Sequence, residues 1–189
     1  IVDGVIAKTS EKPISFNVTE KKKVDETQDK SMKYNAPILN FIDSLNFISS
    51  SLQKLGESLV SSGSELKLLT QTLSDMGYNK TLIEKCKGKG CFPYEWFNKL
   101  SRLQETELPD IQHFYNSLAM TTITQTEYDF AKSVWSDAKC INMQQYLELY
   151  LITDVLILCE VFERFREVMF REHQLDPARF LTLPSFAIN

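Results

Sequence analysis

The feature that most constrains the fold is the segment 142–171, in which apolar residues dominate and neither proline nor glycine occurs. Because nothing in this segment breaks a helix, it predicts a single long helix. Asn142 and Gln145 are typical of an N-cap and its capping-box partner. The helix is expected to be buried nearly all round from Tyr146 to Phe162, and amphipathic where charged residues return after Cys159. It is too short and too interrupted by polar residues to span a membrane.

Asp154 stands out because it is an acidic residue inside this apolar run. The spacing of four that separates Tyr146, Tyr150 and Asp154 places all three on one face of a helix, about 6 Å apart per step. A buried carboxylate must be paired, protonated or bound to a metal. The spacing alone leaves two interpretations open: a structural aspartate satisfied by a basic or backbone group, or a functional one.

Two upstream segments carry residues suited to contacts with a nucleic-acid strand. The apolar run 38–42 predicts a buried strand that ends just before Ser44 and Leu45, a hydroxyl beside an apolar side chain. On spacing alone, Ser44 is also a simple cap for the following helix. The basic, glycine-containing stretch 80–90 includes Lys89 but has neither P-loop nor dinucleotide-binding spacing. Without its neighbours, Lys89 would be interpreted as a solvated surface lysine.

The order of four motifs resembles family B DNA polymerases, in their protein-primed viral, organellar and transposon-borne (Polinton-like) branch. Residues 150–154, Tyr-Leu-Ile-Thr-Asp, are similar to the third exonuclease motif, Tyr-x-x-x-Asp. Residues 41–48 resemble the Ser/Thr-Leu-x-x-hydrophobic motif of this branch, and residues 89–94 resemble its Lys-x-x-hydrophobic segment with the tyrosine that follows. Residues 176–185 look like the passage into the polymerase domain.

The resemblance implies an α/β fold, a partial ribonuclease-H-like 3′–5′ exonuclease domain that is mostly helical here. It divides the chain into a divergent, partly disordered leader (1–36), the C-terminal half of an exonuclease domain (37–175) and the start of a polymerase domain (176–189). The charged segment 20–33 is expected to be a solvated insertion. Hydrophobic spacing predicts further helices near 47–59, 65–76, 93–103 and 127–139, and strands near 1–6 and 14–18.

The same resemblance implies a role for each motif residue. Asp154 would be a carboxylate ligand of a two-metal site that holds Mg²⁺ or Mn²⁺, hard ions that prefer oxygen ligands. Tyr150 would hydrogen-bond the attacking water or the phosphate. The remaining residues would act on the strand: Lys89 steadies the scissile phosphate, Tyr94 helps to position it, and Ser44, Leu45 and Lys89 bind the single-stranded primer end.

Composition limits these expectations. The net charge of −4 gives no overall basic surface, so any contact with DNA must be local. Four cysteines and two histidines lack the spacing of a zinc site, which favours free thiols in a reducing compartment. With no signal peptide or membrane span in the sequence, an intracellular location at a site of DNA replication is expected.

The first two exonuclease motifs, and with them the other metal ligands, are absent upstream of Asp43. The two-metal site is therefore expected to be incomplete, and this chain alone to be inactive. As part of a DNA-directed DNA polymerase, it would have as partners a primer and template, deoxynucleoside triphosphates through the polymerase domain, and a terminal protein primer. The alternative is a non-catalytic helical scaffold or the relic of a transposon-encoded polymerase.

Overall fold

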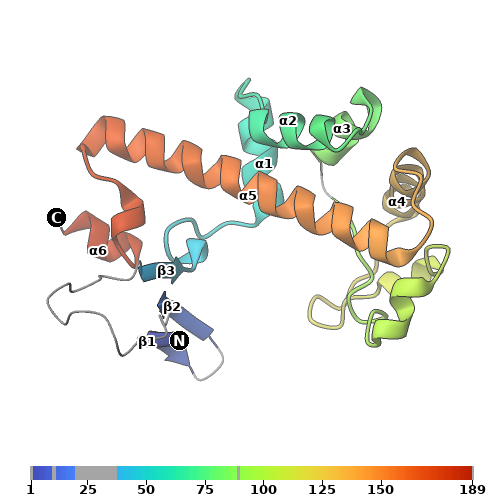
Figure 1. The fold of residues 1–189 in the computed structure, drawn as a ribbon, viewed down its shortest axis with the longest axis horizontal. Coiled ribbons are helices and arrows are strands. Elements are labelled where there is room, and N and C mark those ends of the chain that lie inside the picture. Colours follow the sequence, from blue (N-terminus) through green and yellow to red (C-terminus); the bar gives the residue numbers. More distant parts are fainter. Residues whose placement is uncertain (1, 10–11, 20–37, 89, 189) are drawn as a thin grey trace, which may run out of the picture. The chain divides into compact units, whose positions relative to one another are not determined.

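The computed structural model describes residues 2–9, 12–19, 38–88 and 90–188 (Figure 1). They form two compact units, one made of residues 51–164 and the other of residues 1–50 with 165–189. Helices predominate, and the strands form one small antiparallel sheet. This mixed content is compatible with a fragment of an α/β domain, whereas the ribonuclease-H-like fold remains a prediction.

The unit of residues 51–164 consists of helices gathered on the N-terminal part of one long helix (Figure 1). Its elements are α1 (Leu52–Ser61), α2 (Lys67–Asp75), α3 (Lys80–Cys86), the 3₁₀ helices η2 (Leu100–Gln104) and η3 (Ile111–Phe114), α4 (Gln125–Asp137) and most of α5 (Met143–His173).

The helix starts follow the local sequence. Ser51 and Asn79 accept hydrogen bonds from backbone amides at the first turns of α1 and α3, and Thr124 forms a capping box with Glu127 at α4. Helix α2 has no side-chain cap of its own. Instead, the carboxylate of Glu160 on α5 accepts hydrogen bonds from the amides of Leu68 and Leu69, the latter at 3.3 Å. This tertiary cap ties α2 to α5.

Helix α5 is the long helix that the sequence predicts. Asn142 accepts a hydrogen bond from the amide of Gln145 at 3.1 Å, as an N-cap does. The expectation of burial nearly all round is wrong, because Leu151, Val155 and Leu158 are 49%, 57% and 38% exposed. The buried residues instead recur every three or four positions: Met143, Tyr146, Leu149, Thr153, Ile157 and Val161. Helix α5 is thus amphipathic along its first half as well.

The core of this unit joins α4, α5 and the segment 91–114, and its buried residues are Cys91, Phe92, Leu108, Phe114, Tyr128, Ala131, Met143 and Tyr146. The helix expected at 93–103 is not formed, and turns lead there into η2. Trp96 and Phe97 are half-buried whereas Leu100 is 81% exposed, so these residues do not share one buried face. In the described part of the chain, no helix is long and apolar enough to cross a membrane.

The other unit contains the sheet. Strands β1 (Val2–Thr9), β2 (Lys12–Thr19) and β3 (Ile38–Ile42) pair antiparallel in the order β1-β2-β3. Both N-terminal strands thus form near the predicted places. Among the described strands β3 pairs only with β2, and its residues are largely exposed, so the expectation of a buried strand is wrong. Its Phe41 stacks on Phe16 of β2 with ring centroids 4.7 Å apart. The charged segment predicted as an insertion, residues 20–33, lies outside the described residues.

The C-terminal part of this unit is held by an ion pair. Arg166, near the end of α5, donates from Nε and Nη2 to the two carboxylate oxygens of Asp176, at 2.9 and 2.6 Å. These donors lower the pKa of Asp176 to about 2. Asp176 also accepts from the amide of Ala178 and so starts the 3₁₀ helix η4 (Pro177–Arg179), which precedes α6 (Leu183–Ala187).

Candidate functional site

Tyr94, in the segment that follows Gly90, forms a hydrogen-bonded series with Tyr150 and Asp154 of α5. The hydroxyl of Tyr94 donates to the hydroxyl of Tyr150 at 2.8 Å, and the two rings meet edge to face with centroids 6.0 Å apart. The Tyr150 side chain in turn hydrogen-bonds the carboxylate of Asp154, one helical turn further on. The structure thus brings together three of the residues that the motifs single out, over a separation of 56 residues between the tyrosines.

Packing fixes the Tyr150 ring in this position. The ring of Phe92 lies against it, with centroids 5.5 Å apart. Gly90 approaches so closely that a Cβ atom there would lie 3.0 Å from Cδ2 and Cε2 of Tyr150. The segment 90–94 is anchored next to it, because the Tyr146 hydroxyl donates to the carbonyl of Cys91 at 2.8 Å. Glycine at position 90 therefore serves close packing between this segment and α5.

The two acidic groups at the site both bind their protons more tightly than usual. Burial raises the pKa of Asp154, although the hydrogen bond from Tyr150 partly opposes the shift. The pKa of Tyr150 is raised chiefly by burial and further by the nearby charge of Asp154. Tyr150 consequently remains a hydrogen-bond donor at neutral pH.

Asp154 and Tyr150 line two neighbouring pockets in this unit. The smaller pocket, about 30 Å³, lies between α3, α4 and α5, and its lining includes the side chains of Lys85, Cys86 and Thr153. The other, about 180 Å³, opens between α1 and α5 and is lined by side chains that include Gln53, Glu57 and Lys87. A larger pocket of about 420 Å³ adjoins Tyr94 and Tyr150 and is lined by the apolar side chains Phe114, Tyr115, Leu118 and Ile123, among others. A ligand can therefore approach Asp154 from the side of α1.

A divalent metal is the group that the motif resemblance implies at Asp154. The carboxylate oxygen is of the kind that Mg²⁺ and Mn²⁺ prefer, and Glu57 lines the same pocket. Among the described residues, however, no three His, Cys, Asp or Glu side chains gather as a metal site requires. Among the residues that the structure describes, Asp154 therefore fits one ligand position of such a site.

The other predicted site residues have different outcomes. Lys89 lies outside the described residues. Ser44 and Leu45 belong to the other compact unit, so their approach to Asp154 remains a prediction. They form the 3₁₀ turn η1 (Ser44–Asn46), which Asp43 caps by accepting from the Leu45 amide at 3.0 Å. The next helix is capped by Ser51, so the capping role considered for Ser44 is wrong. Leu45 is 63% exposed, as a strand-binding residue must be.

Sequence reasoning missed the side chains that α1 brings to the pocket, Gln53 and Glu57. They line the same pocket as Asp154 because α1 packs closely on α5 at Gly56, where an added Cβ would lie 3.1 Å from Cγ2 of Ile157. A glycine inside a helical pattern is the signal that could have indicated this close approach.

Comparison with known proteins relates this chain to the type B DNA polymerases. The chain belongs to the family described as DNA polymerase type B, organellar and viral, whose match covers residues 5–189. Among curated proteins it is similar to a probable DNA polymerase from Agaricus bitorquis, at 28% identity over 102 residues. That match covers 53% of this chain but 12% of the relative, so the chain spans only a small part of that protein's length. No solved structure matches. The predicted family is therefore confirmed.

Proposed function

We propose that this chain contributes one side of a metal-dependent 3′–5′ proofreading exonuclease site to a DNA-directed DNA polymerase. The observation that carries the proposal is the series Tyr94–Tyr150–Asp154, in which residues of two separate motifs are hydrogen-bonded beside open pockets. Family membership supports DNA as the partner. In this proposal residues 37–175 are the C-terminal half of a ribonuclease-H-like exonuclease domain, residues 1–36 a divergent leader, and residues 176–189 the start of the polymerase domain.

Asp154 is the metal ligand in this proposal. Among the described residues its half-buried carboxylate has one hydrogen-bond donor, Tyr150, and it faces a pocket, so oxygen lone pairs are available to an incoming cation. A bound Mg²⁺ or Mn²⁺ would supply Lewis-acid activation of water and neutralise phosphate charge. Its positive charge would also favour the ionised form of Asp154, against the effect of burial on the pKa.

Tyr150 and Tyr94 are positioning residues. Because Tyr94 donates to Tyr150, the Tyr150 oxygen has its acceptor site filled and its proton directed at Asp154 or at a ligand beside it. Tyr94 is 62% exposed, so it can exchange this partner for a phosphate oxygen or a water molecule. Both hydroxyls can therefore orient a phosphodiester without carrying charge.

The strand-binding part of the proposal concerns Ser44, Leu45 and Lys89. The exposed Leu45 side chain offers an apolar surface to a base, the Ser44 hydroxyl can bind phosphate or sugar, and Lys89 supplies a cation for the scissile phosphate. The other carboxylates, the deoxynucleotide site and any terminal-protein primer would be supplied by other parts of the polymerase. The 189-residue chain is expected to have no nuclease activity by itself.

The test is Asp154→Asn in the full-length polymerase that contains this chain, compared with Glu148→Gln. Glu148 is an exposed carboxylate on the same helix and lines none of the pockets at Asp154. Asp154→Asn should lower degradation of a single-stranded 3′ end by at least about a hundredfold, because a metal ligand is lost. Nucleotide addition to a matched primer should be retained. Full nuclease activity in Asp154→Asn would refute the proposal and favour a structural role for α5.

A further inference from the structure

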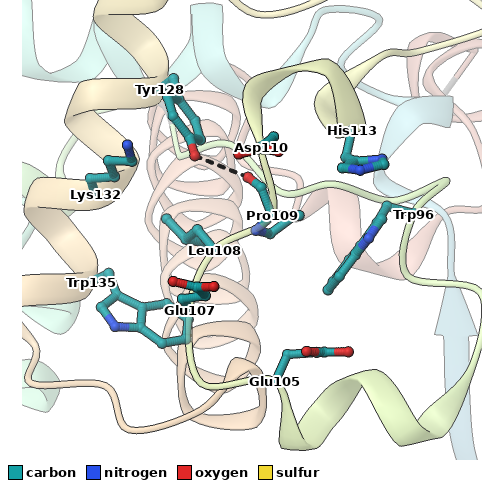
Figure 2. A pocket seen from close by; sticks show the side chains of 10 residues that line it. All are labelled: Trp96, Glu105, Glu107, Leu108, Pro109, Asp110, His113, Tyr128, Lys132 and Trp135. Atoms are coloured by element: carbon teal, nitrogen blue, oxygen red, sulfur yellow. Dashed lines mark hydrogen bonds between the residues drawn. The ribbon is translucent and has the colours of Figure 1, made fainter.

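A separate pocket of about 460 Å³ lies between α4 and the segment 96–113. It shares no lining residue with the pockets at Asp154, and the proposed nuclease role does not use it. Figure 2 shows its wall, in which aromatic rings and carboxylates face the same space. Its lining residues include the aromatic side chains Trp96, Tyr128 and Trp135 and the acidic side chains Glu105, Glu107 and Asp110.

The aromatic rings of this wall already hold cations of the chain itself. The guanidinium of Arg102 lies over the ring of Trp96, with its central carbon 4.0 Å from the centroid. The ammonium of Lys132 lies 4.3 Å from the centroid of Tyr128. Such positions are favourable because the face of an aromatic ring is electron-rich. Arg102 does not line the pocket, and so does not occupy the space between the two tryptophans.

The three carboxylates give the pocket a negative charge. In the described part of the chain, no ion pair involves Glu105, Glu107 or Asp110. Lys132 is the lysine among the pocket's lining residues, which include no arginine. Acidic side chains of this number repel phosphate, so the pocket is unsuited to the backbone of a nucleic acid.

Hydrogen bonds hold the acidic segment in place. The carbonyl of Glu105 accepts from the amide of Met143 at the start of α5, at 2.8 Å. The Tyr128 hydroxyl donates to the carbonyl of Pro109 at 3.1 Å, the dashed line in Figure 2. Between these two anchors, the side chain of Leu108 is buried. The carboxylates are thus presented by a fixed backbone, which reduces the entropy lost when a ligand binds.

We propose that this pocket binds a guanidinium cation, presented by an arginine side chain of a peptide segment or by a free guanidinium compound. A guanidinium is planar, so it stacks on an indole ring as Arg102 does on Trp96, and its fork of donors matches a carboxylate. A lysine ammonium is a strongly hydrated point charge and would gain less from both contacts. This inference does not depend on the proposed nuclease function.

The chain provides its own reporter for this site, because both of its tryptophans line the pocket. Tryptophan fluorescence of the 189-residue chain is titrated with the peptide acetyl-Gly-Arg-Gly-amide. The control peptide carries citrulline, a neutral isostere of arginine, and a further arm uses agmatine, which has the guanidinium but no peptide backbone. The arginine peptide should give a saturable change, with an affinity at least about tenfold higher than the citrulline peptide.

Substitutions then assign the binding to the carboxylates. Glu105→Gln and Glu107→Gln should each weaken the arginine peptide by about threefold to tenfold, since a charge-assisted hydrogen bond is lost. Both glutamates are exposed, so these variants are expected to fold. Glu148→Gln on α5 is the matched control and should bind as the unaltered chain does. Tighter binding of the peptide than of agmatine would identify a protein segment as the source, and equal binding would identify a small guanidinium compound.

Three results would overturn the inference: no saturable response to either guanidinium ligand, an equal response to the citrulline peptide, or unaltered binding in both glutamine variants. Oligothymidylate provides a final check, because the carboxylates should exclude it. Quenching of the tryptophans by oligothymidylate at lower concentration than by the arginine peptide would also overturn it.

Discussion

The close contact between Gly90 and the Tyr150 ring predicts that alanine at position 90 lowers the stability of the chain, whereas alanine at position 88 does not. A Cβ atom added at Gly90 would lie 3.0 Å from two ring carbons of Tyr150, whereas carbon atoms pack best at about 3.5–4.0 Å. Gly90→Ala must therefore displace the ring by about 0.5 Å or more. At Gly88 an added Cβ would meet only the carbonyl oxygen of Lys85 at 3.6 Å, an ordinary contact. Neither glycine is among those with positive φ.

The expected changes in the free energy of unfolding differ between Gly88→Ala and Gly90→Ala. Replacing glycine by alanine stabilises a chain by about 0.4–1 kcal/mol when the native conformation allows it, because the unfolded state loses entropy. Gly88→Ala should show this gain or no change. Gly90→Ala adds an overpacking term of about 1–3 kcal/mol. Displacement of the ring also weakens the Tyr94–Tyr150 hydrogen bond, which contributes about 0.5–1.5 kcal/mol. The net expectation for Gly90→Ala is a loss of about 1–3 kcal/mol.

Urea unfolding of the 189-residue chain, followed by far-ultraviolet circular dichroism, measures both free energies of unfolding. Combining Tyr94→Phe with Gly90→Ala gives a double-mutant cycle, which measures whether the two substitutions affect the free energy of unfolding independently. If Gly90→Ala acts by moving the Tyr150 ring, Tyr94→Phe should cost less in the Gly90→Ala background than alone. Equal effects of Gly88→Ala and Gly90→Ala, or strict additivity with Tyr94→Phe, would refute the reasoning.

Two further predictions concern α5. Because burial raises the folded pKa of Asp154 above its ordinary 3.8, the stability it contributes is fully present below that pH and is lost as the pH rises through the folded pKa. Asp154→Asn should therefore gain stability relative to the unaltered chain as the pH rises from about 4 to 7 in urea melts, and a difference that is constant with pH would contradict this. Glu160→Ala removes the cap of α2 at Leu68 and Leu69 and should cost about 1–2 kcal/mol. Glu160→Gln keeps an acceptor and should cost less, and equal costs in urea melts would contradict the capping role.

Local features of the fold could be predicted from the sequence because their causes are local. Helix α5 has no breaking residue over its whole length, and Asn142 starts it as an N-cap. Thr124 starts α4 in the same way, with Glu127 three residues later. In each case a few adjacent residues contain the information, and tertiary contacts do not alter it.

Burial was harder to predict, because it depends on which other elements pack against a segment. The apolar run of β3 does not reveal that, among the described strands, β2 alone pairs with it. Likewise, leucines and valines occur on every side of α5 between Tyr146 and Phe162, so the 3.6-residue period of the buried face is hidden in the sequence. The residues of α1 at the site were missed for the same reason, since their position follows from the contact between Gly56 and Ile157.

The positions of Tyr150 and Asp154 around the axis of α5 explain why these two polar residues are both partly buried and accessible to a ligand. The buried line runs through Leu149, Thr153 and Ile157, and each residue along a helix is rotated by about 100° from the previous one. Tyr150 and Asp154 each follow a member of this line by one position, so both lie at the edge of the buried face. There they are sheltered enough for burial to raise their pKa values and open enough to line pockets. An aspartate on the buried line itself would be closed to a ligand, and one on the exposed face would keep an ordinary pKa. At the edge of the buried face, a carboxylate is both accessible to a ligand and shifted in its pKa, which is the combination that a functional site requires.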